Sequence, residues 1–255
     1  MTIPRTRHTE PPRYFRAKME LQRRIGDLGH GDTLPAERRL AEELGVSRTT
    51  LRKALAELSA EGVLRREHGS GTYVAPPKVV RVRQLTSLSE DVGVDGKTVD
   101  SRVLACDHVP ADAETQAALE LSRGARVYRV TRLRIVDDEP LAIEIAHLRG
   151  PLRGLAGRLA EDGASLYEAL RVHYSREIAA VEDTVETALA SPDEAELLAV
   201  PTGHPMLMVH RLGRGVDGVA LEWTRSVYRG DRFKFVARAT SPTATTGVAA
   251  EPAAS

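Results

Sequence analysis

The 255-residue sequence has a single cysteine, Cys106, so the chain cannot form an internal disulfide. It has no Cys/His framework for zinc, and its eight histidines show no spacing typical of a metal site. No apolar run approaches the roughly 18 residues of a membrane-spanning helix, and residues 1–15 lack the apolar stretch of a secretory signal. These absences predict a cytoplasmic protein with no metal, no cofactor and no membrane partner.

A dinucleotide site is also excluded, although residues 213–218 match the pattern G-x-G-x-x-G. That fingerprint requires a strand before it and a helix after it. Residues 219–228 are rich in β-branched and aromatic side chains and have no helical periodicity. The match therefore predicts a glycine-rich hairpin loop.

Neither charge sign is in excess over the whole chain, but the two signs are unevenly distributed. Residues 1–75 hold 14 Lys and Arg against 10 Asp and Glu, whereas the rest holds 22 against 26. A basic first part on an acidic remainder hints at a nucleic-acid module. The length favours two domains, and 42% hydrophobic residues are sufficient for packed cores.

Composition also suggests where the domains end. Pro76 and Pro77 lack backbone donors and favour extended chain, as in a semi-rigid linker. Both ends of the chain have few large apolar residues and are expected to be disordered. The expected organisation is an arm (1–12), a first domain (13–75), a linker (76–84), a second domain (85–239) and a tail (240–255).

The first domain has helical periodicity. Apolar spacing predicts helices over 14–28 and 36–44, and Gly45 separates the second helix from a third. Ser47 is a good N-cap for that third helix. Short strand-like runs within 63–74 flank a glycine-rich tip. This order predicts a helix-turn-helix followed by a wing.

The polar face of the third helix suits DNA. Its N-terminal end is the part that enters the major groove in this motif, where Arg48 can contact a guanine edge. Hydroxyls at a helix N-terminus suit phosphates. The alternative is a helical bundle with a solvated basic face. From this pattern, the expected DNA-contacting residues are Ser47, Arg48, Thr49, Thr50 and Arg52 on the helix, with Gly69 and Gly71 at a tight wing tip.

The sequence pattern of the second domain predicts mostly strands, with a few helices. Residues 126–136 and 141–148 are predicted strands, joined by a turn at 137–140. Further strands are expected at 178–189, 206–212, 219–228 and 233–238, and helices near 111–121, 165–173 and 192–199. An antiparallel sheet with helices, an α+β domain, follows.

A ligand pocket is suggested by polar residues on these strands. Arg132 and Arg134 are two apart, so both face one side of the sheet and can clamp a phosphate. Ser165 with Glu168 fits a capping box, and a helix N-terminus is also an anion site. Two solvated arginines and a purely structural cap are the alternatives.

Carboxylates and a phenol occupy nearby strands. Glu144 follows the arginine strand, and Glu222, Thr224, Ser226 and Tyr228 share one face of a later strand. Such groups suit sugar hydroxyls or an amine. Two alternatives remain: a glycosidase pair of Glu144 and Glu222, or exposed polar residues on a strand.

Residues 34–74, LPAERRLAEELGVSRTTLRKALAELSAEGVLRREHGSGTYV, closely resemble the GntR family of bacterial winged-helix regulators. The later segments LTSLSED, ARVYRVTRLRI, EPLAIEIAHL, SLYEAL and EWTRSVYRGDRFKFVAR resemble the HutC branch, most of all its amino-sugar-responsive members. The resemblance implies a chorismate-lyase-like effector domain, called UTRA, and a homodimer on double-stranded operator DNA.

The resemblance also implies roles for individual residues. Arg38, Arg48 and Gly69 would contact operator bases, and Ser47, Thr49, Thr50, Arg52 and His68 would support them or bind phosphates. A pocket for an effector phosphate and sugar would be formed by Ser89, Arg132, Arg134, Glu144, Ser165, Tyr167, Glu222 and Tyr228.

The expected function is a transcriptional regulator and not an enzyme: a repressor released by glucosamine 6-phosphate or its N-acetyl form. One alternative is an enzyme converting a phosphosugar or a chorismate-type substrate, fused to a DNA-binding domain. The other is a constitutive architectural protein whose second domain only dimerises.

Overall fold

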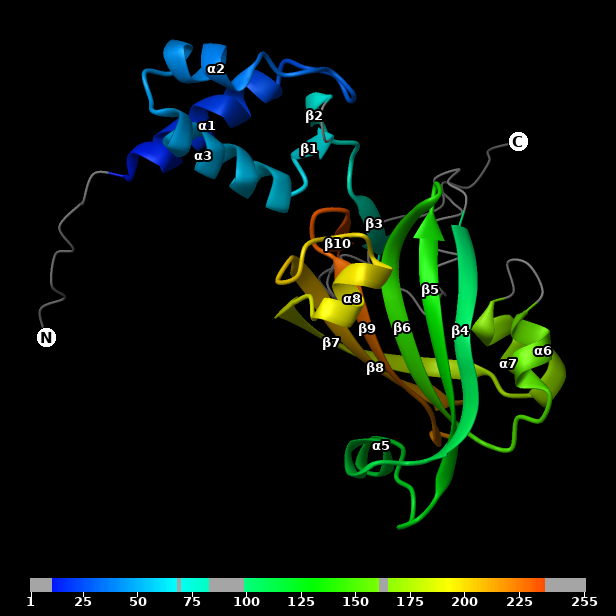
Figure 1. Cartoon of the computed structure of the whole chain (residues 1–255). Coiled ribbons are helices and arrows are strands. Elements are labelled where there is room, and N and C mark those ends of the chain that lie inside the picture. The colour runs from blue at the N-terminus through cyan, green and yellow to red at the C-terminus, as the bar shows by residue number, and fades with distance from the viewer. Residues whose placement is uncertain (1–10, 68–69, 83–98, 161–164, 237–255) are drawn as a thin grey trace, which may run out of the picture.

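The computed structural model describes residues 11–67, 70–82, 99–160 and 165–236. It consists of a helical N-terminal part and a C-terminal part built on a curved sheet (Figure 1). This architecture confirms the predicted winged helix followed by an α+β domain with an antiparallel sheet.

The N-terminal part is built around one central helix. Its elements are α1 (Arg13–Ile25), α2 (Glu37–Glu43), α3 (Arg48–Ala60), β1 (Leu64–Glu67) and β2 (Gly71–Val74). Leu51, Leu55 and Leu58 of α3 are fully buried because their spacing places them on one face of the helix. They pack against Leu21 of α1 and Leu40 of α2.

The connection between α2 and α3 explains the glycine seen in the sequence. Gly45 has a φ of +61°, a left-handed conformation that residues with a Cβ rarely adopt. Ser47 then caps α3, because its side chain accepts a hydrogen bond from the backbone N–H of Thr50. Strands β1 and β2 pair antiparallel as the wing.

The C-terminal part contains a six-stranded sheet in the order β4-β5-β6-β9-β8-β7, with every neighbouring pair antiparallel. The strands are β4 (Val99–Pro110), β5 (Arg126–Val136), β6 (Glu139–Arg149), β7 (Ile178–Leu189), β8 (Pro205–Gly215) and β9 (Ala220–Arg229). The glycine-rich segment 213–218 connects β8 to β9, so the predicted hairpin loop is confirmed.

Helices cover both faces of this sheet (Figure 1). They are α5 (Ala113–Ala118), α6 (Leu155–Leu159), α7 (Leu166–Tyr174) and α8 (Pro192–Leu197). Helices α6 and α7 pack on the face that carries Val130, Ala146 and Leu148. On the opposite face, α8 packs against Leu133 and Ile143, and α5 lies near one end of the sheet.

A separate two-stranded sheet pairs the first and last described strands of the C-terminal part. Strand β3 (Val79–Val82) pairs in parallel with β10 (Phe233–Val236). Part of the segment expected as a linker, residues 76–84, is thus a strand paired with the C-terminal part. This ribbon packs on the same face of the main sheet as α7, through Val79 and Phe233 against Ala142 and Tyr228.

Candidate functional site

The N-terminal end of α3 presents hydroxyls and one arginine to solvent. Arg48 and Thr49 are exposed in its first turn. The Ser47 Oγ lies 3.1 Å from the Thr50 backbone nitrogen and 2.8 Å from the Thr50 Oγ1. This end therefore offers backbone donors, side-chain donors and one free-standing cation in a small area, as a phosphate and base contact requires.

Neighbouring side chains hold the other basic groups of α3. The Arg52 Nε donates to Glu37 of α2 at 2.9 Å. The Lys53 Nζ lies 3.8 Å from the ring centroid of Tyr14 in α1, a cation–π contact. Arg38 extends from α2 with its side chain 83% exposed, and its Nε lies 3.9 Å from a Glu42 oxygen, a longer contact than that of Arg52 with Glu37. Arg38 and Arg48 are therefore freer to reach a ligand than Arg52.

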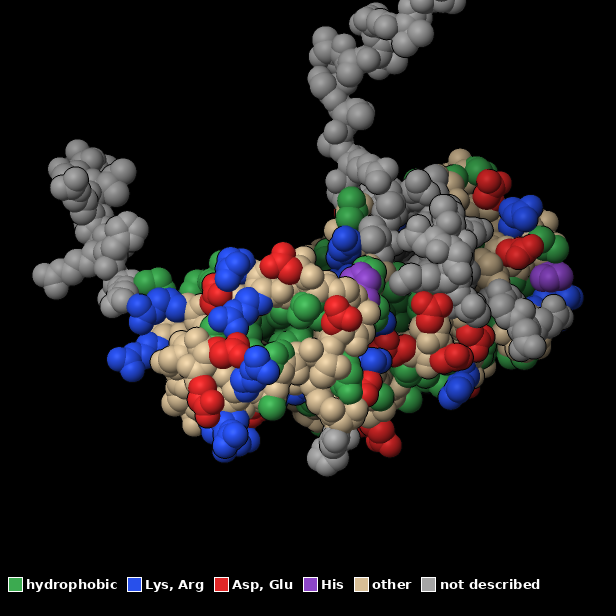
Figure 2. All heavy atoms as spheres, turned by 90° about the horizontal axis from the view of Figure 1, so that it is seen from above, with side chains coloured by type: hydrophobic (Ala, Val, Ile, Leu, Met, Phe, Trp, Pro, Cys, Tyr) green, Lys and Arg blue, Asp and Glu red, His purple; other side chains and the backbone are tan. Residues whose placement is uncertain are grey.

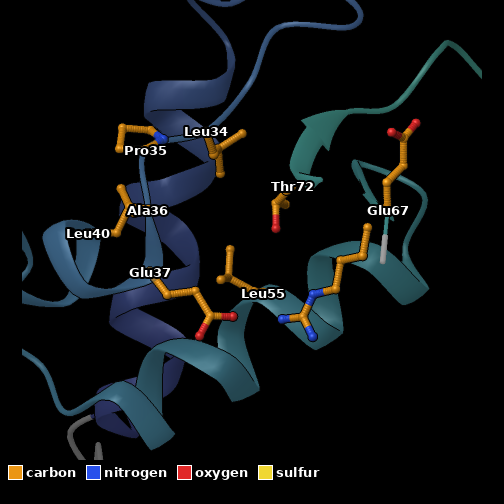
Figure 3. Close-up of a pocket in the computed structure, with 10 residues that line it drawn as sticks. Leu34, Pro35, Ala36, Glu37, Leu40, Leu55, Glu67 and Thr72 are labelled. Atoms are coloured by element: carbon orange, nitrogen blue, oxygen red, sulfur yellow. The ribbon is translucent and has the colours of Figure 1, made fainter. Parts of the chain in front are cut away.

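A cleft separates α2 from the wing. It has a volume of about 510 Å³ and runs between Glu37 at the start of α2 and Thr72 in the wing, with Leu55 of α3 between them (Figure 3). Arg66 also lines it. Gly71 begins the second wing strand with a φ of +144°. His68 and Gly69 lie outside the described residues.

Basic side chains are spread over the N-terminal part of the molecule, interspersed with acidic ones (Figure 2). Many of the acids are already paired with arginines of their own helices, as in Glu20 with Arg23 and Glu43 with Arg39. Exposed pairs of this kind contribute little stability. Among the described residues, Arg48 forms no such ion pair, so its charge is not offset by an acidic neighbour in this part of the structure.

In the C-terminal part, the structure brings the predicted pocket residues together beneath α7. Arg132 and Arg134 of β5 lie beside Glu144 of β6, and all three are buried. The Arg132 Nη2 donates to a Glu144 oxygen at 2.9 Å, and the Arg134 Nε lies 3.8 Å from the same oxygen. The strand register explains this, since Arg132 and Glu144 are directly opposite.

One donor in this cluster is unused. The Nε of Arg132 is buried and has no hydrogen-bond partner among the described residues. A buried donor without a partner costs roughly 1–3 kcal/mol, and an anion placed there would remove that cost. The Arg132 Nε can therefore donate a hydrogen bond to an added acceptor, such as a ligand anion.

Tyr167 and Glu222 form the other side of the pocket. The Tyr167 hydroxyl donates to Glu222 at 2.6 Å, and the Thr224 hydroxyl donates to the other Glu222 oxygen at 2.9 Å. Burial raises the pKa of Glu222, an effect that the Tyr167 hydrogen bond and the Arg211 charge partly offset. Burial and the Glu222 charge raise the pKa of Tyr167 well above its usual value.

Ser165 and Tyr228 lie at the edges of the pocket. Ser165 is buried and caps α7, as predicted, by accepting from the Glu168 backbone N–H at 3.4 Å. The Tyr228 hydroxyl donates to Glu144 at 3.3 Å. Ser89 lies outside the described residues.

Arg211 lines the pocket but was not predicted from the sequence. It lines the same cavity, with Asp183 holding its guanidinium through two bonds of 2.6 and 2.8 Å. Burial lowers the pKa of Arg211, but the hydrogen bond and charge of Asp183, together with Tyr167, outweigh this and keep the pKa raised. Alternation along the predicted strand 206–212 puts Arg211 on one face, but which face and which partner depend on register.

The cavity enclosed by these groups is narrow, at about 30 Å³. That is room for a water molecule and not for a sugar. The residues of two internal contacts line this space: the ion pair of Arg132 with Glu144 and the hydrogen bond of Tyr167 with Glu222. A ligand of monosaccharide size has to open at least one of them.

Comparison with known proteins agrees with both halves of this geometry. Residues 14–74 match the model of the gntR family of bacterial regulatory proteins, and residues 95–234 match the UTRA domain. The chain belongs to the GntR family. The predicted family and its HutC-type effector domain are thereby confirmed.

Individual relatives cover most of this GntR-family chain. It is 36% identical over 230 residues to the transcriptional repressor NagR of Bacillus subtilis, a match covering 88% of this chain and 93% of NagR. It is 32% identical to the mannosyl-D-glycerate transport/metabolism system repressor MngR of Escherichia coli, covering 82% and 88%. The solved structure of PhnF from Mycobacterium smegmatis has a TM-score of 0.63 at 32% identity, covering 88% and 99%.

These relatives are transcriptional repressors, and the chain is a DNA-binding transcriptional repressor of the same type. Within the described ranges, no three His, Cys, Asp or Glu side chains come together in a way that would hold a metal ion. No helix of the described part is long and apolar enough to cross a membrane.

Proposed function

We propose that this repressor leaves its operator when a phosphorylated amino sugar, glucosamine 6-phosphate or its N-acetyl form, binds the pocket beneath α7. The observation that carries this proposal is the buried cluster of arginines with an unused Arg132 donor. Buried ion clusters are weak evidence for stability, so a ligand is the better reason to keep one. The resemblance to amino-sugar-responsive regulators supplies the sugar class.

At the phosphate end, we assign the contacts to Arg132, Arg134 and the start of α7. Paired guanidiniums bind phosphate through charge-assisted hydrogen bonds. The backbone donors after Ser165 lie at a helix N-terminus, which favours anions. Tyr167 and Ser89 complete this end in the proposal.

At the sugar end, the proposed contacts are Glu144, Glu222 and Tyr228. Carboxylates accept hydrogen bonds from hydroxyls and from an amine or amide nitrogen. A sugar donor reaching Glu144 or Glu222 competes with the internal bond that the carboxylate now accepts from Arg132 or Tyr167. Ligand entry and rearrangement of these two pairs are therefore the same event.

At the DNA, we assign base contacts to Arg38, Arg48 and the wing tip at Gly69. Hydroxyls and basic groups around them would hold phosphates or position these contacts: Ser47, Thr49, Thr50, Arg52 and His68, with Gly71 allowing the wing to turn. A hundredfold loss of operator affinity on effector binding corresponds to a coupling free energy of about 2.7 kcal/mol.

The test is the double variant Arg132→Ala with Arg134→Ala. We expect it to lose the phosphosugar response in a gel shift while apo operator binding stays intact. The matched control is Arg126→Ala with Arg129→Ala, which removes the same charge from the same strand at two exposed positions. Because Glu144 loses its partners, thermal melting must show that the first variant is folded.

Calorimetry separates the remaining possibilities. Unchanged phosphosugar binding by the Arg132/Arg134 variant would show that these arginines do not form the ligand site. Tight binding of the unphosphorylated sugar would show that recognition does not depend on the phosphate. Product analysis of the same mixtures tests the enzyme alternative, since conversion of the sugar phosphate would show a catalyst.

A further inference from the structure

The strand that leads out of the winged helix, β3, is tied to the effector domain along β10 and the turn before it. The Val79 backbone N–H donates to the Arg232 carbonyl at 2.7 Å, and the Lys78 Nζ donates to the Gly230 carbonyl at 2.6 Å. In Figure 1, β3 and β10 lie between the N-terminal part and the main sheet. Any shift of β10 therefore moves the start of the connection to the DNA-binding domain.

Two stacked aromatic rings connect this ribbon to the pocket. The rings of Tyr228 in β9 and Phe233 in β10 are 4.2 Å apart and nearly parallel, at 20°. Both side chains are fully buried. The Tyr228 hydroxyl donates to one oxygen of Glu144, whose other oxygen accepts from Arg132. A chain of direct contacts thus runs from the pocket arginine to the strand paired with β3.

The turn between the two aromatic residues is too constrained to absorb a shift. Asp231 accepts from Arg229 at 2.8 Å and lies 3.0 Å from His204. Arg232 pairs with Glu139 at 2.7 Å. Gly230 lies so close to the Pro205 carbonyl that a Cβ there would be 2.8 Å from its oxygen.

The surrounding core also transmits movement. Val79, Tyr228 and Phe233 belong to one buried apolar cluster with Ala142 and Val209. Protein interiors are close-packed, so a displaced ring moves its neighbours instead of filling a void. Displacement of Tyr228 is therefore passed to Phe233 and Val79.

We propose that Phe233 is the residue that couples the pocket to the DNA-binding domain, acting through Tyr228 on one side and the β3–β10 pairing on the other. It contacts no ligand. A ligand group that takes over the Glu144 oxygen breaks its hydrogen bond with the Tyr228 hydroxyl, and the Tyr228 ring then shifts against Phe233. The inference rests on the proposed function, because effector binding is the event that starts the movement. It adds the residues through which the movement reaches the DNA-binding domain.

The first experiment compares Phe233→Leu with the control Phe235→Leu. Phe235 lies two residues along the same strand and packs on the same cluster, but the described ring contacts place only Phe233 against Tyr228. For Phe233→Leu we expect effector affinity and apo operator affinity within about threefold of the parent, while effector-induced release falls from about 100-fold to under 10-fold. The control keeps full release.

Two results would overturn the inference: full release in Phe233→Leu, or loss of effector binding together with release, since the latter marks a merely structural residue. If Phe233→Leu melts more than about 5 °C below the parent, Phe233→Met replaces it, because a flexible side chain of similar volume keeps the packing without the ring.

A second experiment needs no effector. Glu144→Ala removes the acceptor for Tyr228, and we expect it to change the hydrogen-exchange rate of the Val79 amide by more than about threefold. In a Phe233→Leu background the change should disappear, and in a Phe235→Leu background it should persist. Equal changes in both backgrounds would overturn the path. Failure of every amino-sugar phosphate to release the parent protein would instead overturn the proposed function alone.

Discussion

At the scale of single residues, the pocket is an almost balanced cluster of buried charges. Its cations are Arg132, Arg134 and Arg211, and its acids are Glu144, Asp183 and Glu222. Adding a phosphate to such a cluster brings negative charge that needs compensation. Glu222 is an acid that can take up a proton in response, because burial already raises its pKa.

This gives a prediction for Glu222→Gln. An acid whose pKa is higher in the folded than in the unfolded state binds protons on folding, so the stability of the folded protein falls as pH rises through that window. The window begins near the unfolded value of about 4.3. We expect the variant and the parent to melt alike near pH 4, and the variant to melt higher at pH 7.

The control for this experiment is Glu196→Gln, at an exposed position of α8. It should show no growing difference from the parent across the same pH range. Thermal melts at half-unit pH intervals give the comparison. A Glu222→Gln variant that melts below the parent at pH 7 would show that its hydrogen bonds to Tyr167 and Thr224 outweigh the cost of burying the charge.

At the scale of elements, the sequence pattern predicted the helices and strands whose formation depends mainly on residues within the same segment. The predicted strands 126–136 and 178–189 coincide with β5 and β7, because alternation and turn residues mark them. Strand β4 was not predicted, although it is twelve residues long, and neither was the five-residue helix α6. Both depend on contacts outside their own segments, β4 with β5 and α6 with α7 and β4.

The candidate site divides in the same way. Arg132 and Arg134 could be paired from sequence because strand alternation alone puts them on one face. The contact of Arg211 with Asp183 depends on the register of β7 and β8, and that of Tyr167 with Glu222 on the packing of α7. No local signal carries either contact, so Arg211 was missed.

The cap of α3 allows a prediction at this scale. Ser47→Ala should destabilise the protein by about 0.5–2 kcal/mol, whereas Ser47→Gly should cost only a few tenths, because glycine is tolerated at an N-cap. If the hydroxyl also binds a DNA phosphate, both variants lose operator affinity equally. Denaturant melts and gel shifts together separate the two roles. Operator affinity that follows stability alone would leave Ser47 a cap and nothing more.

At the scale of the whole molecule, one winged helix provides a small reading surface. A single module buries only about 600–1,000 Å² on DNA, which limits its specificity. Two winged-helix domains (the two heads of a dimer) related by a two-fold axis bind a pseudo-palindromic operator and double that surface. We propose that the effector domain joins two chains, so that sedimentation at micromolar concentration gives about twice 27.8 kDa.

The operator should then show the spacing of such a pair. Inserting about 5 base pairs between the half-sites turns one half-site to the opposite face of the duplex, since a helical turn is about 10–10.5 base pairs. We expect affinity to fall to that of an isolated half-site, and an insertion of about 10 base pairs to restore part of it. Because β3 is paired with β10, the heads are not on free tethers that could follow either change. Equal affinity for all three spacings would show that each head binds independently. A protein that sediments as a monomer and still binds the full operator tightly would contradict the two-fold arrangement.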